Sequence, residues 1–574
     1  MWAFQPHFRI GLEHSTRDVF NQIGFGLGAR AYLVGFANDA STRFPTCFEP
    51  ETDPLASVDL ADVVQLAEKR YAAHPERQII ITSGLHHDRF HRYLRDKMRA
   101  EVLRDLLQAH PLGAGQHFFV GASALVEGYE VHPVIALPRK RWQSKPTLTR
   151  VKVDRYTVEP SFQHAVLNEL LERATKDLSQ RDAPEDFSLR WLDRSEIVRQ
   201  AARRFVQSVS LLAGHTSPSE LTVALDEVSA QPYEGRSSAG GFILAREDSP
   251  HVDVLLRFER PIRLSETRGI RKALEMTGDV YKLLCDGEKV LALARLGDGY
   301  DGASESVFQF DVVSRGTWEL RHHGTSLLRV TNTRPVIPSP RLDSDHFRDV
   351  VTRTFSECSP TDVDRLWELA SASARAKHGT MLVVHREAAE EAERMLPQSQ
   401  KIAASQLSLD AVDAVTRIDG AVLVDLTGRC HAVGVILDGR ATGSGDASRG
   451  ARFNSAIRYE EAQHGKCLVI VVSEDGMINM LPRLRRRVRR EAVEGVVGKL
   501  EFEVQKMTPD YERFFRHWEH LETLSFYLNK QQCHRVNAAR RQLEEHRRKH
   551  SQMSVSWSEL EPNADMNDSY FLGD

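Results

Sequence analysis

The stretch from residue 359 to 482 constrains the fold most strongly, because helix-like and strand-like segments alternate along it with clear boundaries. Ser359, Pro360 and Asp362 predict a helix start, with a hydroxyl N-cap, proline at the first helical position and an acid in the first turn. The apolar runs 380–385 and 467–472 predict buried strands. This alternation is typical of an α/β domain with helices packed on a sheet.

Asp419 lies between a predicted helix, 408–416, and a predicted strand, 422–425, which turns back at Thr427 and Gly428. In open α/β folds, side chains at the ends of strands contact ligands. We therefore expect Asp419 to be a functional carboxylate at an edge of the sheet.

A glycine-rich loop, 438–450, leads into a predicted helix that begins near Ala451 and Arg452. Such a loop presents backbone N–H groups to an anion, and an arginine at the helix start adds a planar charged fork for phosphate oxygens. A polar turn that begins at Ser473 and Glu474 follows the strand 467–472. Its carboxylates are suited to a divalent metal or a ribose hydroxyl, so the segment predicts a polyphosphate site.

Composition narrows the function classes. The chain has 76 Lys and Arg residues and 80 Asp and Glu residues, which gives a net charge of −4. The overall charge therefore does not indicate a nucleic-acid-binding protein. The exception is the arginine cluster 483–490, for which a solvated helix face is the plainer interpretation. Apolar runs are far shorter than the roughly 18 residues of a membrane span. The six cysteines show no CxxC spacing, and the first residues show no secretory signal, so we expect a cytoplasmic protein without a structural zinc site.

The order of four motifs resembles the diadenylate cyclase (DAC) domain family. The motifs are HGTMLVVHRE (378–387), RIDGAVLVDLTGRCHAVGVILDG (417–439), RGARFNSAI (449–457) and CLVIVVSEDGMI (467–478). The resemblance implies a central mixed β-sheet flanked by helices on both faces. It also implies an enzyme that condenses two ATP molecules into cyclic di-AMP, releases two pyrophosphates and uses Mg²⁺ or Mn²⁺. Because each nucleotide attacks the other, two such domains are expected to face each other in a homodimer or higher homo-oligomer.

The same resemblance assigns roles to individual residues. Asp419 would bind metal and orient the attacking hydroxyl, and Arg452 would hold phosphates as the second catalytic residue. Glu474 would be a further metal ligand. The nucleotide-binding residues implied are Gly420, Ala421, Gly450, Ala451, Phe453, Asn454, Ser473 and Glu474.

One departure from the family pattern keeps alternatives open. The family's histidine and second arginine are replaced by Phe453 and Asn454, which removes two phosphate-directed donors. Arg440, Arg449 or Arg458 are candidate substitutes. Phe453 either stacks on the adenine or, as is commoner for an aromatic residue at a helix start, belongs to the core. The alternatives are a domain that binds ATP or a cyclic dinucleotide without turnover, and a cyclase with a different product.

The chain as a whole is predicted to be an α/β multidomain protein with five segments. Residues 235–340 resemble, more loosely, the probable sensor domains that precede DAC domains in some bacterial proteins, which implies regulation by an unknown sensor ligand. The predicted segments are an N-terminal α/β domain (1–140), an α+β sensor domain (147–340), a DAC-like domain (346–500), a helical extension (501–550) and an acidic disordered tail (551–574). The basic stretch 138–146 is predicted to be the linker after the first domain.

Overall fold

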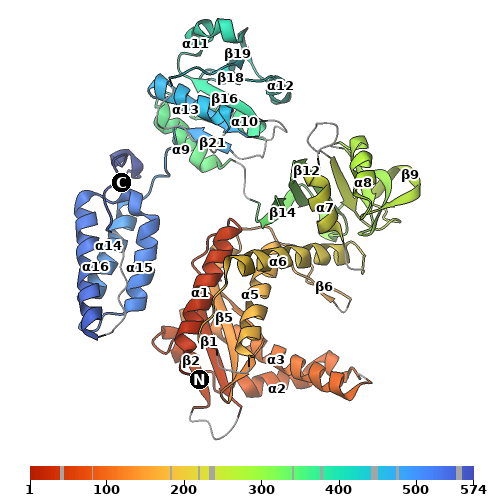
Figure 1. Ribbon diagram of the computed structural model, residues 1–574, viewed down its shortest axis with the longest axis vertical. Helices are drawn as coiled ribbons and strands as arrows, with labels where there is room; N and C mark the ends of the chain where they lie inside the picture. Colours follow the sequence, from red (N-terminus) through yellow and green to blue (C-terminus); the bar gives the residue numbers. More distant parts are fainter. Residues whose placement is uncertain are drawn as a thin grey trace. The chain divides into compact units, whose positions relative to one another are not determined.

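The computed structural model divides the chain into two compact units, residues 1–339 and 340–574 (Figure 1). It describes residues 1–38, 44–80, 82–154, 156–180, 184–216, 220–231, 240–278, 280–338, 342–374, 379–440, 450–473, 478–550 and 559–573. Among these residues, no helix is both long and apolar enough to cross a membrane. The mixed α/β class predicted from the sequence is the class that the structure has.

The first unit contains two larger sheets and a small hairpin. Its helices are α1 (Gln5–Gln22), α2 (Val63–Ala73), α3 (Gly84–Ala109), α4 (Arg139–Trp142), α5 (Phe162–Leu178), α6 (Trp191–Leu212), α7 (Leu221–Ala230) and α8 (Thr267–Ala273). Its strands are β1 (Arg30–Ala37), β2 (Thr46–Glu49), β3 (Gln116–Val120), β4 (Ala124–Val126), β5 (Tyr129–Pro138), β6 (Lys152–Val153), β7 (Tyr156–Thr157), β8 (Gly240–Leu244), β9 (Val252–Arg263), β10 (Tyr281–Cys285), β11 (Lys289–Leu296), β12 (Phe308–Ser314), β13 (Thr317–His322), β14 (Thr325–Thr331) and β15 (Arg334–Val336).

The five-stranded sheet of the first unit is buried on both faces. Its path is β2-β1-β5-β3, with β4 also paired to β5. Alternate residues of β1 enter opposite cores, with Leu33 in one and Val34 in the other, as the two-residue period of a strand requires. The predicted linker at 138–146 instead begins with α4, which buries Trp142.

The eight-stranded sheet follows the order β15-β14-β13-β12-β8-β10-β11-β9. One hydrophobic core extends over both sheets, because it contains residues of each, among them Leu33 of β1 and Trp318 of β13. The two sheets of the first unit therefore share packing, rather than lying in two independent cores.

The second unit contains a six-stranded mixed sheet and a helical bundle. Its helices are α9 (Ser344–Thr354), α10 (Pro360–Ala374), α11 (Ala388–Arg394), α12 (Leu409–Val415), α13 (Ala451–Gln463), α14 (Arg490–Val504), α15 (Tyr511–Thr523) and α16 (Lys530–His550). Its strands are β16 (Thr380–His385), β17 (Gln400–Gln406), β18 (Ala421–Val424), β19 (Arg429–Val435), β20 (Cys467–Val472) and β21 (Ile478–Leu481).

The sheet of the second unit has the order β17-β19-β18-β16-β20-β21, with β16 and β18 parallel and the other neighbours antiparallel. Residues of β16 alternate between two cores: Leu382 packs with α9, α10 and α12, and Val383 packs with α11 and α13. Ala421 pairs with both Met381 and Val435, and Val472 pairs with Thr380. The starts of β16 and β18 and the ends of β19 and β20 therefore lie along one edge, which we call the site edge.

The predicted start of α10 is confirmed by its capping geometry. The N–H of Asp362 donates to Oγ of Ser359 at 3.2 Å, and the N–H of Ser359 donates to Oδ2 of Asp362 at 3.1 Å. This is a reciprocal cap of the kind that fixes helix starts. The strands predicted at 380–385 and 467–472 have those bounds in the structure.

The helical bundle starts earlier than predicted, because α14 begins at Arg490 and packs into one core with α15 and α16 (Figure 1). The predicted boundary at 501 falls inside α14. The prediction that the acidic tail is disordered is wrong for residues 559–573, the part of the tail that the structure describes. Tyr570 is buried in the bundle core, and the N–H of Val488 donates to the carbonyl of Tyr570 at 3.0 Å.

Residues 483–489 of the arginine cluster lie outside any helix, and only Arg490 belongs to α14, as its first residue, so the predicted helix face is wrong. Arg486 pairs with Asp343 at 2.7 Å, and Arg487 pairs with Asp349. Arg485 lies over the ring of Phe526 at 4.7 Å. These arginines connect the sheet domain to the bundle through contacts within the chain.

Candidate functional site

Asp419 is held at the site edge by a close approach of two backbone segments. The φ of Gly420 is +112°, and a Cβ there would lie 2.6 Å from the carbonyl carbon of Gly434. Only glycine fits such a position without strain. The N–H of Gly420 donates to Oδ1 of Asp419 at 3.1 Å, while the Asp419 side chain is 90% exposed. The carboxylate is thus fixed on its backbone side and open to solvent.

Arg452 reaches the same carboxylate from the start of α13. Its Nη2 donates to Oδ1 of Asp419 at 3.1 Å. Gly450 is the N-cap residue of α13 and supplies no side-chain cap. The first N–H groups of a helix lack intrahelical partners and carry a partial positive charge, so this end of α13 is suited to an anion. The structure therefore brings Asp419 and Arg452 together, as the sequence predicts.

The other predicted nucleotide-binding residues occupy varied positions. Ala421 is fully buried in the sheet, so only its backbone is available to a ligand. Ala451 is exposed at the helix start, and Asn454 donates from Nδ2 to the carbonyl of Gly450 at 3.3 Å. Ser473 is half-buried at the end of β20. Glu474 lies outside the described residues, as do residues 441–449 of the glycine-rich loop.

Phe453 belongs to the core. It is 4% exposed and packs in the cluster under α11 and α13. The guanidinium carbon of Arg483 lies 4.8 Å from the centre of its ring. The core interpretation of Phe453 therefore matches the structure, and stacking of its ring on adenine does not.

A buried polar network that the sequence did not predict holds α13 in place. Glu391 is 6% exposed and accepts hydrogen bonds from Oη of Tyr459 at 2.7 Å, Nε2 of Gln463 at 3.1 Å and Nη2 of Arg394 at 2.6 Å. Burial by itself would raise the pKa of Glu391, but the hydrogen bonds from Arg394 and Tyr459 outweigh it and lower the pKa. Burial and the adjoining carboxylate raise the pKa of Tyr459. Glu391 is thus ionised at neutral pH and fully hydrogen-bonded.

Arg394 extends this network to the start of the glycine-rich loop. Its Nη1 and Nη2 donate to the two carboxylate oxygens of Asp438 at 2.7 and 2.9 Å. The next residue, Gly439, packs against Arg458 of α13 so closely that a Cβ would lie 2.6 Å from the carbonyl carbon of Arg458. Both ends of the loop are therefore anchored to α13, which positions Arg452 beside Asp419.

The donor set at the site edge fits a hard divalent cation held together with a nucleotide. Mg²⁺ is commonly bound through one or two carboxylates plus substrate phosphates, and Asp419 offers such a carboxylate. Within the described residues no group of three or more metal-ligating side chains is present. A metal here would therefore be shared between Asp419 and the phosphates, with Glu474 as the second predicted ligand.

Family models match three regions of the chain. Residues 1–206 match the probable sensor domain DACNG, and residues 219–324 match the probable sensor domain DACNH. Residues 369–483, which contain the site edge, match the DisA bacterial checkpoint controller nucleotide-binding domain.

Two of the solved structures that match part of the chain illustrate the similarity. A double-cysteine mutant of DacA from Staphylococcus aureus is 20% identical, covers 24% of this chain and 97% of its own, and has a TM-score of 0.19. A hypothetical membrane spanning protein from Bacillus cereus is 25% identical, covers 23% of this chain and 63% of its own, and has a TM-score of 0.18. No curated protein matches the chain.

Proposed function

Residues 369–483 form a DisA-type nucleotide-binding (DAC) domain behind two probable sensor domains, and on this basis we propose that the protein is a diadenylate cyclase. The reaction joins two ATP molecules into cyclic di-AMP and releases two pyrophosphates. The single observation that carries the proposal is the contact between Asp419 and Arg452, 33 residues apart, at the site edge.

The residues of the site edge have separate roles in an in-line phosphoryl transfer. The exposed Asp419 carboxylate orients the 3′-hydroxyl that attacks the α-phosphate of the second ATP. Arg452 and the N-terminal N–H groups of α13 neutralise charge on that phosphate as the bond to pyrophosphate breaks. Mg²⁺ or Mn²⁺, when bound at Asp419, supplies further charge neutralisation to the phosphates.

Arg452 must change partners during this cycle. In the structure its guanidinium pairs with the carboxylate of Asp419 at 3.1 Å. A phosphate that binds at the start of α13 competes for the guanidinium, and the carboxylate is then released to the metal and the hydroxyl. Each active site needs two nucleotides facing each other, so we propose that two copies of the domain pair.

A chain-terminating nucleotide tests the proposal. The protein is incubated with ATP, with 3′-deoxy-ATP and with both, and pyrophosphate release is followed. We expect release from ATP with Mg²⁺ or Mn²⁺ and none from 3′-deoxy-ATP alone, which lacks the attacking hydroxyl. Equal release from both nucleotides would indicate hydrolysis and exclude the cyclase.

A second candidate function rests on the Phe453 and Asn454 departure. Because Phe453 is core and Asn454 bonds to Gly450, neither replaces the donors that the family pattern has at those positions. The domain would then bind ATP or a cyclic dinucleotide without turnover. Thermal stabilisation by ATP without pyrophosphate release distinguishes this candidate from the cyclase. Incubation with the four ribonucleoside triphosphates in competition distinguishes a cyclase with another product.

A further inference from the structure

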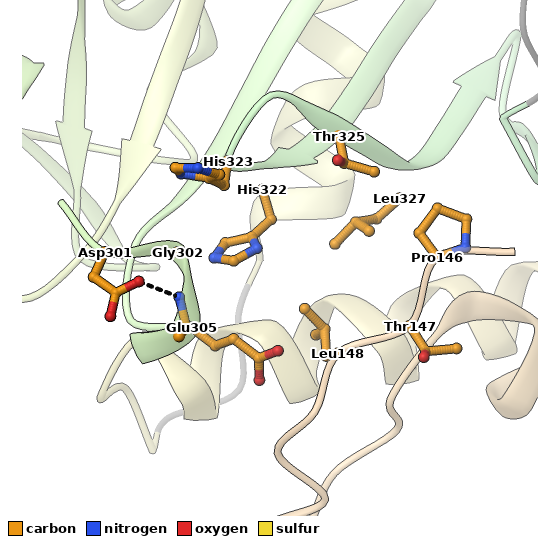
Figure 2. Close-up of a pocket in the computed structure, with 11 residues that line it drawn as sticks. Pro146, Thr147, Leu148, Asp301, Gly302, Glu305, His322, His323, Thr325 and Leu327 are labelled. Atoms are coloured by element: carbon orange, nitrogen blue, oxygen red, sulfur yellow. Dashed lines mark hydrogen bonds between the residues drawn. The ribbon is translucent and has the colours of Figure 1, made fainter.

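The first unit contains a cavity of about 300 Å³ at the seam between the regions that match the two sensor families (Figure 2). One wall is the segment Pro146 to Leu148. The opposite wall is formed by the loop around Asp301 and by the turn between β13 and β14. A molecule bound here would therefore contact both sensor regions.

Glu305, in the lining of the cavity, is held in place by hydrogen bonds. Glu305 is 4% exposed, and its carboxylate accepts from the N–H of Thr149 at 2.6 Å and the N–H of Arg150 at 2.9 Å. Its φ of +45° lies in the left-handed region, as does that of His323 at +44°. Side-chain-bearing residues rarely adopt this conformation, and they do so where the surroundings impose it, often at ligand sites.

His322 directs an N–H donor into the cavity. The hydroxyl oxygen of Tyr300 accepts from the N–H groups of Ser306 at 3.3 Å and Val307 at 3.2 Å, which occupies its lone pairs. Its proton therefore goes to Nε2 of His322, 3.0 Å away, in preference to the carbonyl of Val307 at 3.3 Å. The neutral imidazole then carries its hydrogen on Nδ1.

The ring of His322 stays neutral at physiological pH, because burial lowers its pKa. Figure 2 shows this ring projecting between Glu305 and Leu327 toward the centre of the cavity. A ligand must therefore present a hydrogen-bond acceptor to His322.

The charges of the lining select against anions. Asp301 and Glu305 are carboxylates, and among the described residues that line the cavity none is Lys or Arg. A phosphate or carboxylate placed here would meet the like charge of these carboxylates. Pro146, Leu148 and Leu327 offer apolar surface to the body of a ligand.

We propose that this cavity binds a small, phosphate-free, uncharged molecule that accepts a hydrogen bond from His322, and that this molecule is the ligand of the sensor unit. Nucleotides, including the substrate and product of the proposed reaction, do not fit its charge. The proposal concerns binding by residues 146–327 and stands whether or not the second unit is a cyclase.

Matched probes test the proposal on the full chain. Ligand-observed NMR is recorded with nicotinamide, benzamide and cytosine, and with nicotinate, which differs from nicotinamide by a carboxylate in place of the amide. We expect one or more of the neutral probes to bind. We expect nicotinate to bind with an affinity at least about tenfold lower than that of nicotinamide.

Two variants localise the binding. Thr325→Trp, at the exposed start of β14, fills the cavity, and Arg334→Trp, at the exposed start of β15 and outside the lining, is the control. We expect the neutral probes to lose binding in Thr325→Trp and to keep it in the control, with unchanged melting temperatures. His322→Phe keeps a ring but removes the N–H, so we expect weaker probe binding. Failure of all neutral probes to bind, equal binding of nicotinate, or undiminished binding in Thr325→Trp would overturn the proposal.

Discussion

Replacing Glu391 with glutamine tests whether the buried network holds α13 in place. The change keeps the shape of the side chain and removes its charge. The hydrogen bond from buried Tyr459 then becomes a neutral one, and the charged guanidinium of Arg394, which is 45% exposed and counts for less, loses its ion-pair partner. Hydrogen bonds to charged groups contribute about 1.5–3 kcal/mol and neutral ones about 0.5–1.5 kcal/mol, so we expect a loss of about 2 kcal/mol.

A loss of that size corresponds to about a 30-fold change in an opening equilibrium. The assay is hydrogen exchange of the full chain, read from peptides within 451–463, with peptides of the bundle as the internal control. We expect faster exchange in α13 and an unchanged bundle. Unaltered protection of α13 would refute the role of Glu391.

The pH dependence of the same variant gives a second check. The folded state lowers the pKa of Glu391 from its ordinary value of 4.5, so its contribution is present at neutral pH and is lost as the pH falls through the folded pKa. In urea unfolding, the difference between wild type and Glu391→Gln should therefore shrink in acid. A difference that is constant from pH 7 to pH 3 contradicts the assignment of a charged Glu391.

Three further experiments test other parts of the structure. Gly420→Ala forces a Cβ into the backbone of Gly434 at a φ of +112° and should lower the free energy of unfolding by about 2 kcal/mol or more. The control is Gly450→Ala, where a Cβ meets no atom within 4 Å and the change should be nearly neutral. Equal melting temperatures for the two variants would contradict this expectation. Tyr570→Ala removes a buried ring on which Arg353 stacks at 4.3 Å and should cost about 3 kcal/mol in the bundle, measured by exchange in α14; an unchanged α14 would show that the tail does not support the bundle. Because the cluster arginines contact partners within the chain, duplex DNA should not bind at 150 mM salt in a gel-shift assay, and tight binding with a steep salt dependence would revive the nucleic-acid interpretation.

Sequence reasoning reached the parts of the site that depend on local signals. The capping residues of α10, the apolar runs of β16 and β20, and the glycine-rich approach to α13 each carry their information within a few neighbouring positions. The position of Asp419 at a sheet edge followed from the same reasoning, because a strand begins just after it.

The supporting contacts could not be derived in that way. Arg394 meets Asp438 across 44 positions, and Tyr459 meets Glu391 across 68, so no local pattern marks them as partners. The side of α13 on which Phe453 lies depends on how the helix is rotated against β20 and β21. The packing of residues 559–573 depends on Tyr570, whose burial requires a bundle core that local composition does not show.

The production of cyclic di-AMP from ATP tests the central claim most directly. Wild-type protein and Asp419→Asn are incubated with ATP and Mg²⁺ or Mn²⁺, and the dinucleotide is quantified by mass spectrometry. The proposed function predicts product from the wild type and a reduction of about 100-fold or more in Asp419→Asn, which keeps the shape of the side chain but not its charge. Absence of product from the wild type, or equal product from both proteins, would contradict the assignment.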